Sequence, residues 1–556
     1  MAQHFPDRRE FREMFSAILS PEAGFYKVVL VYSLAISLLT LAVPISLQLL
    51  VDTVANIALL RAVVLIALLL FTLLFLSGVM YALRAYAMEL FSRKLYARIS
   101  SEIAMTAMLA EPEYFEHKQK TDLFNRYFDI VTLKKNIPYI LTNGFTLILQ
   151  SFIGFTVVSF YHFYFFIFSV MLIFLIWLIW RVWGWRAIET SFRLSDSKYQ
   201  TADWLQSLAM NSASYRSSQN PSYAIENTNR LVDSHIQCQV DHFRNTYAQL
   251  IGMLMLYAAA SAVLLGIGGW LVIEGELTLG QLVAAELIMS AIFVGLPQMA
   301  GYLDSLYYVC AAVEELARFR DVKTEGPENE PAILLKHDEE LVFSKVKLEE
   351  PVQPMEFNFE LPGRGLFRVS GDILCLRRIA ELLCRNYRPV SGLITIGGHD
   401  NTDIPRQELR KAVRIISRVT VPPMTVREFL NLYIRPEGKY SRQQALSLLR
   451  LDDEIAHLSD GLDTTLSRDA WPLSQPQAIK LKLASALLSE PSVLVLEDIV
   501  DAVDPHIIDV FLSAMQQLNT IVLYFTKRQD IGEFDYHFHL ADNEQSIVKL
   551  EKGAAE

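Results

Sequence analysis

The chain has 556 residues, of which 52% are hydrophobic and 20% charged, and its formal net charge is −11. A chain of this length is expected to form more than one domain. The acidic balance argues against a nucleic-acid-binding protein, because a phosphate backbone is bound by clustered lysine and arginine side chains. The four cysteines show no metal-ligand or redox spacing, which favours a reduced, cytoplasm-facing context.

Long apolar runs fill the first part of the chain, up to about Phe319. A membrane-spanning helix needs about 20 apolar residues, and six segments are long enough: 26–50, 62–86, 139–160, 163–184, 247–273 and 279–311. Three of the links between them are short, whereas the links after the second and fourth spans are long and polar. We therefore predict a cytoplasmic N-terminal segment over 1–25 and a six-helix, all-α transmembrane domain over 26–320, embedded in a lipid bilayer.

Basic residues indicate the orientation of these spans. Lysine and arginine concentrate in the N-terminal segment and in the two long links. By the positive-inside rule those parts are cytoplasmic, and both chain termini are then cytoplasmic as well. We expect a protein of the bacterial cytoplasmic (inner) membrane.

The rest of the chain reads as a soluble α/β mixture. Residues 321–337 carry Pro, Gly and acidic side chains and are predicted to be a linker. Within 338–556, the runs VLVLED and TIVLYFT are continuously apolar, which is typical of strands covered on both faces. We expect an α/β domain over 338–556.

Several spaced stretches resemble one known family. In the membrane part these are PEYFEHKQKTDLFNRYFDI (112–130), GELTLGQLVAAELI (275–288) and AAVEELARF (311–319). In the soluble part they are RPVSGLITIGGHDNTDI and PLSQPQ…ALLSEPSVLVLED. With the six spans, they make nearly the whole chain resemble an ABC exporter half-transporter of the six-helix type found among bacterial type I secretion, lipid and peptide exporters.

The resemblance implies a fold and an assembly. It implies long cytoplasmic extensions of the transmembrane helices, a P-loop-type nucleotide-binding domain and a homodimer of half-transporters. The stretch 112–130 looks like the first cytoplasmic coupling segment of the family, and a partner protein could dock there.

The resemblance also places the phosphate loop of the family on SGDILCLR, residues 370–377. Such a loop needs G-x-x-x-x-G-K-[ST], because the glycines let backbone N–H groups close on the phosphates and the lysine neutralises their charge. Here Cys375 stands at the second glycine, Leu376 at the lysine and Arg377 at the metal-bound hydroxyl, while Asp372 adds negative charge. The five positions that define the altered loop are Ser370, Gly371, Cys375, Leu376 and Arg377.

The two arginines of this loop allow two interpretations. Arg377 and Arg378 could attract another anion at a helix N-terminus. They could also be ordinary solvated or salt-bridged side chains, and we expect the second.

The other nucleotide-site positions of the family differ as well. They are Glu350 (adenine-stacking position), Arg418 (metal-sensing glutamine), Leu473, Ser474, Gln475, Pro476 and Gln477 (signature LSGGQ), Glu497 and Asp498 (strand-end carboxylates, transposed), and Thr526 (switch histidine). Pro476 has no N–H to give to a γ-phosphate, and the side chain of Asp498 is one methylene shorter than the catalytic glutamate. An intact partner subunit would not rescue the site, since the phosphate loop and the signature are altered in the same chain.

These changes together predict a domain that is retained for its shape. We expect no catalytic residue, no cofactor and no metal at these positions, and weak binding of ATP and Mg²⁺ without turnover is left open. Three functions remain: transport without ATP hydrolysis, a scaffold or regulatory role, and ATP-driven export of peptide, protein or lipid-like substrates through an unconventional site.

Two carboxylates of the sixth span are candidates for a substrate path. Glu286 lies within the apolar run, where ionisable residues are expensive and often functional. It could bind a cationic substrate or carry a proton, or it could lie in a water-filled vestibule or bond to a neighbouring helix. Asp304 is expected at the depth of a cytoplasmic cavity and is the second candidate.

Overall fold

The computed structural model describes residues 8–56, 60–111, 114, 120–217, 222–326, 340–348, 355–541 and 544–550. The chain divides into two compact units, Met1–Glu325 and Gly326–Glu556, and each is described by itself. Glu350, the predicted adenine-stacking position, lies outside the described residues.

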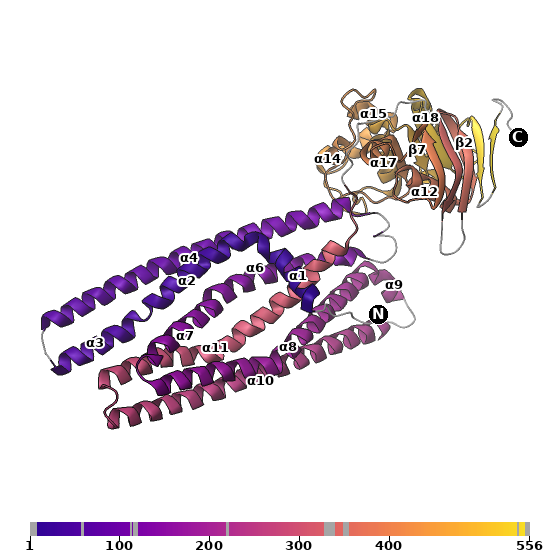
Figure 1. Cartoon of the computed structure of the whole chain (residues 1–556). Helices are drawn as coiled ribbons and strands as arrows, with labels where there is room; N and C mark the ends of the chain where they lie inside the picture. Colours follow the sequence, from indigo (N-terminus) through magenta and orange to yellow (C-terminus); the bar gives the residue numbers. More distant parts are fainter. Residues whose placement is uncertain are drawn as a thin grey trace. The chain divides into compact units, whose positions relative to one another are not determined.

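The first unit is helical (Figure 1). Its elements are α1 (Arg8–Leu19), η1 (Ser20–Glu22), α2 (Ala23–Leu39), α3 (Ala42–Asn56), α4 (Leu60–Leu109), η2 (Lys120–Phe128), α6 (Asp129–Tyr139), η3 (Ile140–Gly144), α7 (Phe145–Ser159), α8 (Phe163–Met210), α9 (Ser212–Ser217), α10 (Ser222–Ile273), α11 (Leu279–Ala317) and η4 (Arg318–Asp321). Among the described residues, six helical segments are long and apolar enough to cross a membrane, which confirms the six predicted spans.

Three of these helices are much longer than a bilayer core. α4, α8 and α10 have 50, 48 and 52 residues, so each is roughly 70–80 Å long. Because a hydrocarbon core is about 30 Å thick, each extends well beyond the membrane, which agrees with the expected helical extensions. α8 and α10 run side by side, whereas α4 packs along α2 and α3 (Figure 1).

The turns between the spans have clear sequence causes. His162 precedes α8, and its side chain accepts a hydrogen bond from the Tyr164 N–H at 3.2 Å. Thr278 precedes α11 and forms a reciprocal capping box with Gln281, which satisfies two of the free N–H groups at the helix start. Both links therefore end at polar capping residues.

Apolar side chains of α4 remain exposed over most of its first half. Leu65, Leu68, Phe71 and Phe75 are each between 66% and 69% exposed. Such a continuous apolar surface is typical of a lipid-facing helix or of a protein interface.

The described residues of the second unit form two sheets. The four-stranded sheet has the order β2-β1-β4-β5, and the six-stranded sheet has the order β10-β9-β3-β8-β7-β6. Their strands are β1 (Leu341–Leu348), β2 (Met355–Leu361), β3 (Gly365–Gly371), β4 (Ser391–Ile396), β5 (His399–Asp400), β6 (Val413–Ile416), β7 (Val493–Leu496), β8 (Ile521–Phe525), β9 (Tyr536–Leu540) and β10 (Gln545–Lys549). From β9 to β6 the larger sheet is parallel, and β10 pairs antiparallel at its edge.

The central parallel strands β7 and β8 are buried on both faces, as their apolar runs predict. In β7, Leu494 and Leu496 join one hydrophobic cluster, whereas Val493 and Val495 join the other. Side chains alternate between the faces of a strand, so other elements must cover both faces; on one of them, strands β1, β2 and β4 and helix α12 share the cluster. The helices of this unit are α12 (Ile373–Leu383), α13 (Arg406–Ala412), α14 (Val426–Asn431), α15 (Arg442–Leu448), α16 (Asp452–Ala456), α17 (Gln475–Ser489) and α18 (Pro505–Gln517), with the short turns η5 (Gly461–Asp463) and η6 (Asp498–Ala502).

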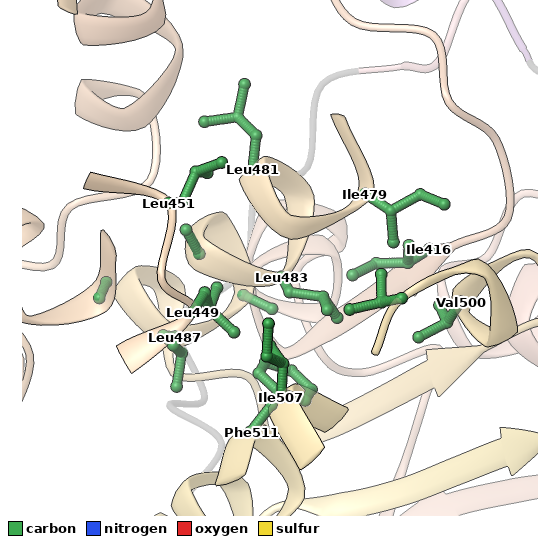
Figure 2. Packing of buried hydrophobic residues seen from close by; sticks show 14 of the residues in the cluster. Ile416, Leu449, Leu451, Ile479, Leu481, Leu483, Leu487, Val500, Ile507 and Phe511 are labelled. Atoms are coloured by element: carbon green, nitrogen blue, oxygen red, sulfur yellow. The ribbon is translucent and has the colours of Figure 1, made fainter. Parts of the chain in front are cut away.

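Helix α17 lies at the centre of one of these clusters. Figure 2 shows Ile479, Leu483 and Leu487 of this helix packed among Ile507 and Phe511 of α18 and neighbouring side chains. Each of the three α17 side chains is fully buried. The helix that follows the signature position is thus part of an intact core.

Candidate functional site

The loop after β3 is the position predicted for phosphate binding. Gly371 has a φ of +106°, and a Cβ atom there would lie 1.9 Å from the carbonyl oxygen of Leu540. The next residue, Asp372, donates its N–H to that same oxygen at 2.8 Å. The chain therefore turns tightly against β9 and needs glycine for this close approach.

Helix α12 begins directly after this turn, at Ile373, three residues before the lysine position of the family. The Asp372 side chain caps it by accepting a hydrogen bond from the Leu374 N–H at 2.8 Å. A helix N-terminus attracts anions through its free N–H groups and its dipole. Here a carboxylate of the chain itself already bonds to one of these groups.

Two of the altered loop residues belong to the hydrophobic core. Cys375 and Leu376 are fully buried and belong to the same hydrophobic cluster as the interior of β3. Leu376, at the lysine position, contributes apolar packing and no positive charge. Ser370, at the start of the loop, bonds through its hydroxyl to His537 at 2.8 Å and to His539 at 3.1 Å.

Arg377 joins the altered loop to the end of β7. Its Nε lies 2.7 Å from Oε1 of Glu497, and its terminal nitrogen lies 2.5 Å from Oε2. Such a bidentate pair is among the stronger charge-assisted contacts. The hydrogen bond to Glu497 raises the pKa of Arg377, and the carboxylate itself is 1% exposed.

The guanidinium therefore stands at the hydroxyl position of the family and contacts the carboxylate at its metal-partner position. Arg378 forms a second ion pair, with Glu381. The salt-bridged interpretation of the two arginines is the one that the structure supports.

The signature position forms an ordinary helix start. Ser474 and Gln477 make a capping box at the beginning of α17, in which the Ser474 N–H donates to Gln477 Oε1 at 2.8 Å. Pro476 lies in the first turn, where N–H groups have no partner within the helix and proline is tolerated. Leu473 is buried, whereas Ser474, Gln475 and Pro476 are exposed. The sequence at this position is thus well suited to starting a helix.

The switch-histidine position is tied to a residue that sequence reasoning missed. Thr526 donates from its hydroxyl to Oδ1 of Asp501 at 2.8 Å, and the Tyr524 hydroxyl donates to the same oxygen at 2.6 Å. Burial, followed by the hydrogen bond to Asp501, raises the pKa of Tyr524. The sequence feature that could have pointed to Asp501 is its position three residues after Asp498, in the turn that follows the strand.

The remaining candidates of this unit lie at its surface. The side chains of Asp498 and Arg418 are exposed. The backbone oxygen of Arg418 accepts a hydrogen bond from the Lys482 ammonium group. Burial, together with the charges of Arg414 and Arg418, lowers the pKa of Lys482 to about 8.

Groups that a magnesium nucleotide would contact are thus already bonded within the chain. The Glu497 carboxylate holds a guanidinium, the start of α12 holds the Asp372 carboxylate, and Leu376 replaces a cationic side chain in the core. At the positions that the family uses for phosphate and metal, these groups therefore have partners within the chain, and residues 370–377 contain no lysine.

The two membrane carboxylates lie far apart on α11. Glu286 and Asp304 are separated by 18 residues, or roughly 27 Å along a helix. Glu286 accepts a hydrogen bond from Ser290 at 3.1 Å through Oε1, whereas its Oε2 is buried and has no hydrogen-bond partner among the described residues. An unsatisfied buried carboxylate oxygen is costly, which favours a functional role for Glu286.

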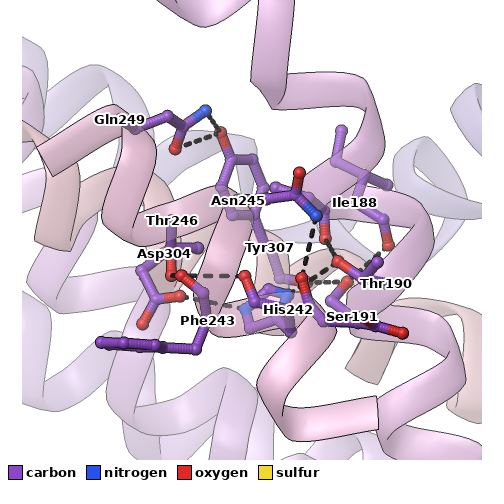
Figure 3. Close-up of polar contacts among 12 residues, drawn as sticks. Ile188, Thr190, Ser191, His242, Phe243, Asn245, Thr246, Gln249, Asp304 and Tyr307 are labelled. Carbon is purple, nitrogen blue, oxygen red and sulfur yellow. Dashed lines mark hydrogen bonds and ion pairs between the residues drawn. The ribbon is translucent and has the colours of Figure 1, made fainter. Parts of the chain in front are cut away.

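Asp304 belongs to a polar network between α8, α10 and α11 (Figure 3). Its Oδ1 lies 3.1 Å from Nε2 of His242, and Nδ1 of this histidine lies 3.1 Å from the Thr190 hydroxyl. Close by, Gln249 donates to the Tyr307 hydroxyl at 2.8 Å. Sequence reasoning missed His242, which is 3% exposed, because a single histidine in a polar link carries no pattern of its own.

Asp304 also lines a hollow of about 440 Å³ between α6, α10 and α11. Four aromatic side chains contribute to its wall: Tyr139, Phe243, Tyr247 and Tyr302. A carboxylate beside aromatic faces suits an organic cation. Asp304 therefore lines this hollow, whereas Glu286 is not part of its wall.

Comparison with known proteins identifies the class of this molecule. The family of the ABC transporter transmembrane region matches residues 28–296, and the ABC transporter family matches residues 378–500. Together the two matches cover most of the chain in the order found in exporters. The chain belongs to the ABC transporter family, and its six spans followed by an α/β domain form the architecture of an exporter half-transporter.

Individual relatives are distant. The chain is 27% identical to the ABC multidrug transporter mdr2 of Aspergillus fumigatus over 43% of this chain and 31% of that protein. It is 22% identical to the alpha-hemolysin translocation ATP-binding protein HlyB of Escherichia coli O157:H7, over 48% and 38%. It is 24% identical to the lactococcin-A transport/processing ATP-binding protein LcnC of Lactococcus lactis, over 52% and 41%. The matched part is less than half the length of each of these relatives.

A solved structure shares the fold along nearly the whole length. The structure of a bacterial Atm1-family ABC exporter with ATP bound aligns with a TM-score of 0.79 and 18% sequence identity, covering 95% of this chain and 96% of that chain. The match to the ABC transporter family over 378–500 includes the signature and the strand-end carboxylates, and it begins directly after the loop 370–377.

Proposed function

We propose that this protein is an ABC-exporter-type membrane protein that works without hydrolysing ATP, as a homodimer whose α/β unit is retained for its shape. The bidentate contact between Arg377 and Glu497 carries the proposal. In this contact, the carboxylate at the metal-partner position of the family already binds a guanidinium of the same chain. The loop has no lysine, and the carboxylate that would hold the metal is bonded to an arginine. Charge compensation and water activation would then be lost, and each is worth orders of magnitude in rate.

Thermal unfolding of the purified chain in detergent tests this proposal. We expect that 1 mM Mg-ATP raises the melting temperature by less than 1 °C relative to 1 mM magnesium sulfate. A site with a Kd of 10 µM would add about 2.7 kcal/mol at this hundredfold excess, which corresponds to roughly 5–10 °C for a unit of this size. An ATP-specific rise of that size contradicts the proposal.

Within this proposal, the buried oxygen of Glu286 favours transport driven by a proton gradient over a purely structural role. A carboxylate in a span can take up a proton on one side of the membrane and release it on the other. Oε2 of Glu286 has no hydrogen-bond partner among the described residues, so it can accept that proton without breaking a bond. The aromatic hollow beside Asp304 would receive a cationic solute.

Proteoliposomes with an imposed pH gradient and ethidium as the probe test this role. We expect Glu286→Gln to reduce the gradient-driven flux of ethidium to that of protein-free liposomes, since an amide cannot exchange the proton. The matched control is Glu274→Gln, which removes an exposed carboxylate from the turn before α11. Equal flux in Glu286→Gln and wild type would instead favour a scaffold or regulatory subunit that binds a partner protein through the coupling segment 112–130.

ATP-driven export is the second candidate, and the relatives favour it. Two of the relatives above are named as ATP-binding proteins for hemolysin translocation and lactococcin transport, and the third as a multidrug transporter. Under this function the chain would export peptide, protein or lipid-like substrates through an unconventional ATP site. Turnover of ATP by the purified protein decides between the two candidates.

A further inference from the structure

A second hollow of the helical unit lies between α4 and α6 and has a volume of about 520 Å³. Its wall combines charged and amphipathic side chains. The charged ones are Arg84, Glu89, Lys134 and Lys135. Three cations therefore face one carboxylate, and Tyr81, Met88 and Tyr139 add apolar and aromatic surface.

The position of Arg84 along α4 places this hollow at a membrane surface. The 22 residues 62–83 contain no charged side chain, and in a helix they extend about 33 Å. This length matches a hydrocarbon core of about 30 Å. Arg84 is the first charged residue after that run, and tyrosines such as Tyr81 and Tyr86 flank it, as is typical of the interface between lipid tails and headgroups.

Arg84 carries a buried charge that pairs with neutral groups. Its side chain is 2% exposed. One terminal nitrogen donates to the Ser33 hydroxyl at 3.0 Å and to the Thr146 hydroxyl at 2.5 Å, and the guanidinium lies 5.1 Å from the Tyr81 ring centre. No carboxylate forms an ion pair with Arg84 among the described residues. A buried cation without a counter-ion is costly, so an anion in the hollow would stabilise it.

The other charged side chains of the wall also favour an anion in the hollow. The Glu89 carboxylate already accepts a hydrogen bond from Arg93 Nε at 2.9 Å, so it does not serve Arg84. Lys134 and Lys135 are exposed on α6, which leaves their ammonium groups accessible at the mouth of the hollow. A strongly hydrated ammonium and a buried guanidinium together suit a phosphate group.

We propose that this hollow binds the phosphate of an anionic phospholipid in the leaflet next to the basic links, with the acyl chains along the exposed apolar surface of α4. The headgroup lies between Arg84 and the two lysines of α6. Lipid recognition by basic pockets between transmembrane helices follows the same chemistry. The inference does not depend on whether the α/β unit hydrolyses ATP.

Native mass spectrometry of the full chain, released from nanodiscs of equal parts phosphatidylglycerol and phosphatidylcholine, tests the proposal. We expect wild type to retain phosphatidylglycerol in preference to phosphatidylcholine. Each basic charge near a membrane surface changes affinity about fivefold, so Lys134→Gln/Lys135→Gln is expected to lower this retention by roughly 25-fold. Both side chains are exposed, and the double variant is therefore expected to fold.

The matched control removes two arginines at the end of another span. Arg181→Gln/Arg186→Gln changes exposed side chains of α8 by the same total charge, and it is expected to leave the retention unchanged. An equal loss in both double variants would mean that the lipid preference is a general effect of interface charge and would overturn the site. Displacement of the lipid by 1 mM glycerol 3-phosphate would also overturn it, because the hollow would then serve a free phosphate.

Discussion

Purified protein in lipid nanodiscs is expected to release phosphate from Mg-ATP no faster than a heat-inactivated sample. Three features of the α/β unit explain this expectation. Leu376 is buried at the lysine position, Asp372 caps α12, and Arg377 bonds both oxygens of Glu497. A transferring phosphoryl group needs positive charge and a positioned water. A sensitive coupled assay of released phosphate gives the measurement.

A variant of the strand-end carboxylates sharpens this test. Glu497→Asp/Asp498→Glu restores the order of the two acid types found in the family. We expect this double variant to remain inactive as well, because the altered phosphate loop is unchanged. Turnover by wild type that disappears in Asp498→Asn would contradict the proposal and favour the ATP-driven exporter.

Removal of the Arg377 side chain is expected to destabilise the α/β unit. Arg377→Ala would leave the Glu497 carboxylate, which is 1% exposed, without its bidentate partner. Breaking a buried ion pair typically costs 3–5 kcal/mol. Because the Arg377 side chain is 47% exposed, we reduce this to about 2–3 kcal/mol, or roughly a 5–10 °C lower melting temperature. Thermal or urea unfolding followed by circular dichroism checks the change.

Two further variants separate the buried charge from other effects. Arg377→Met/Glu497→Leu replaces both partners with apolar side chains and is expected to recover most of the lost stability. Arg427→Ala breaks a bidentate pair with Asp463 at the surface and is expected to change stability little. A loss in Arg427→Ala as large as that in Arg377→Ala would show that burial of Glu497 is not the cause.

The elements that depend on local pattern could be predicted from the sequence. The six spans follow from apolar length alone, and the buried strands β7 and β8 follow from their continuous apolar runs. The sequence predicts a solvated or salt-bridged Arg377 without naming a partner. That partner could not be predicted, since Glu497 lies 120 residues further along the chain and only the folded sheet brings the two together.

Other contacts had no sequence signal strong enough to find them. The start of α12 at Ile373 depends on Asp372 and on the close approach of Gly371 to Leu540, which is a tertiary contact. The pair of His242 and Asp304 joins two helices whose register cannot be read from composition. Both cases are decided by packing between distant segments, which overrides local preference.

The ion pair between Arg377 and Glu497 affects whether the α/β unit responds to dissolved cations in the cell. Under the proposed function, the counter-charge for this buried acid is covalently part of the polypeptide. The acid therefore needs no dissolved cation, and its neutralisation is the same in a starved cell as in a well-fed one. Such a unit would report nothing about cellular energy, and its contribution to the membrane assembly would be constant in time.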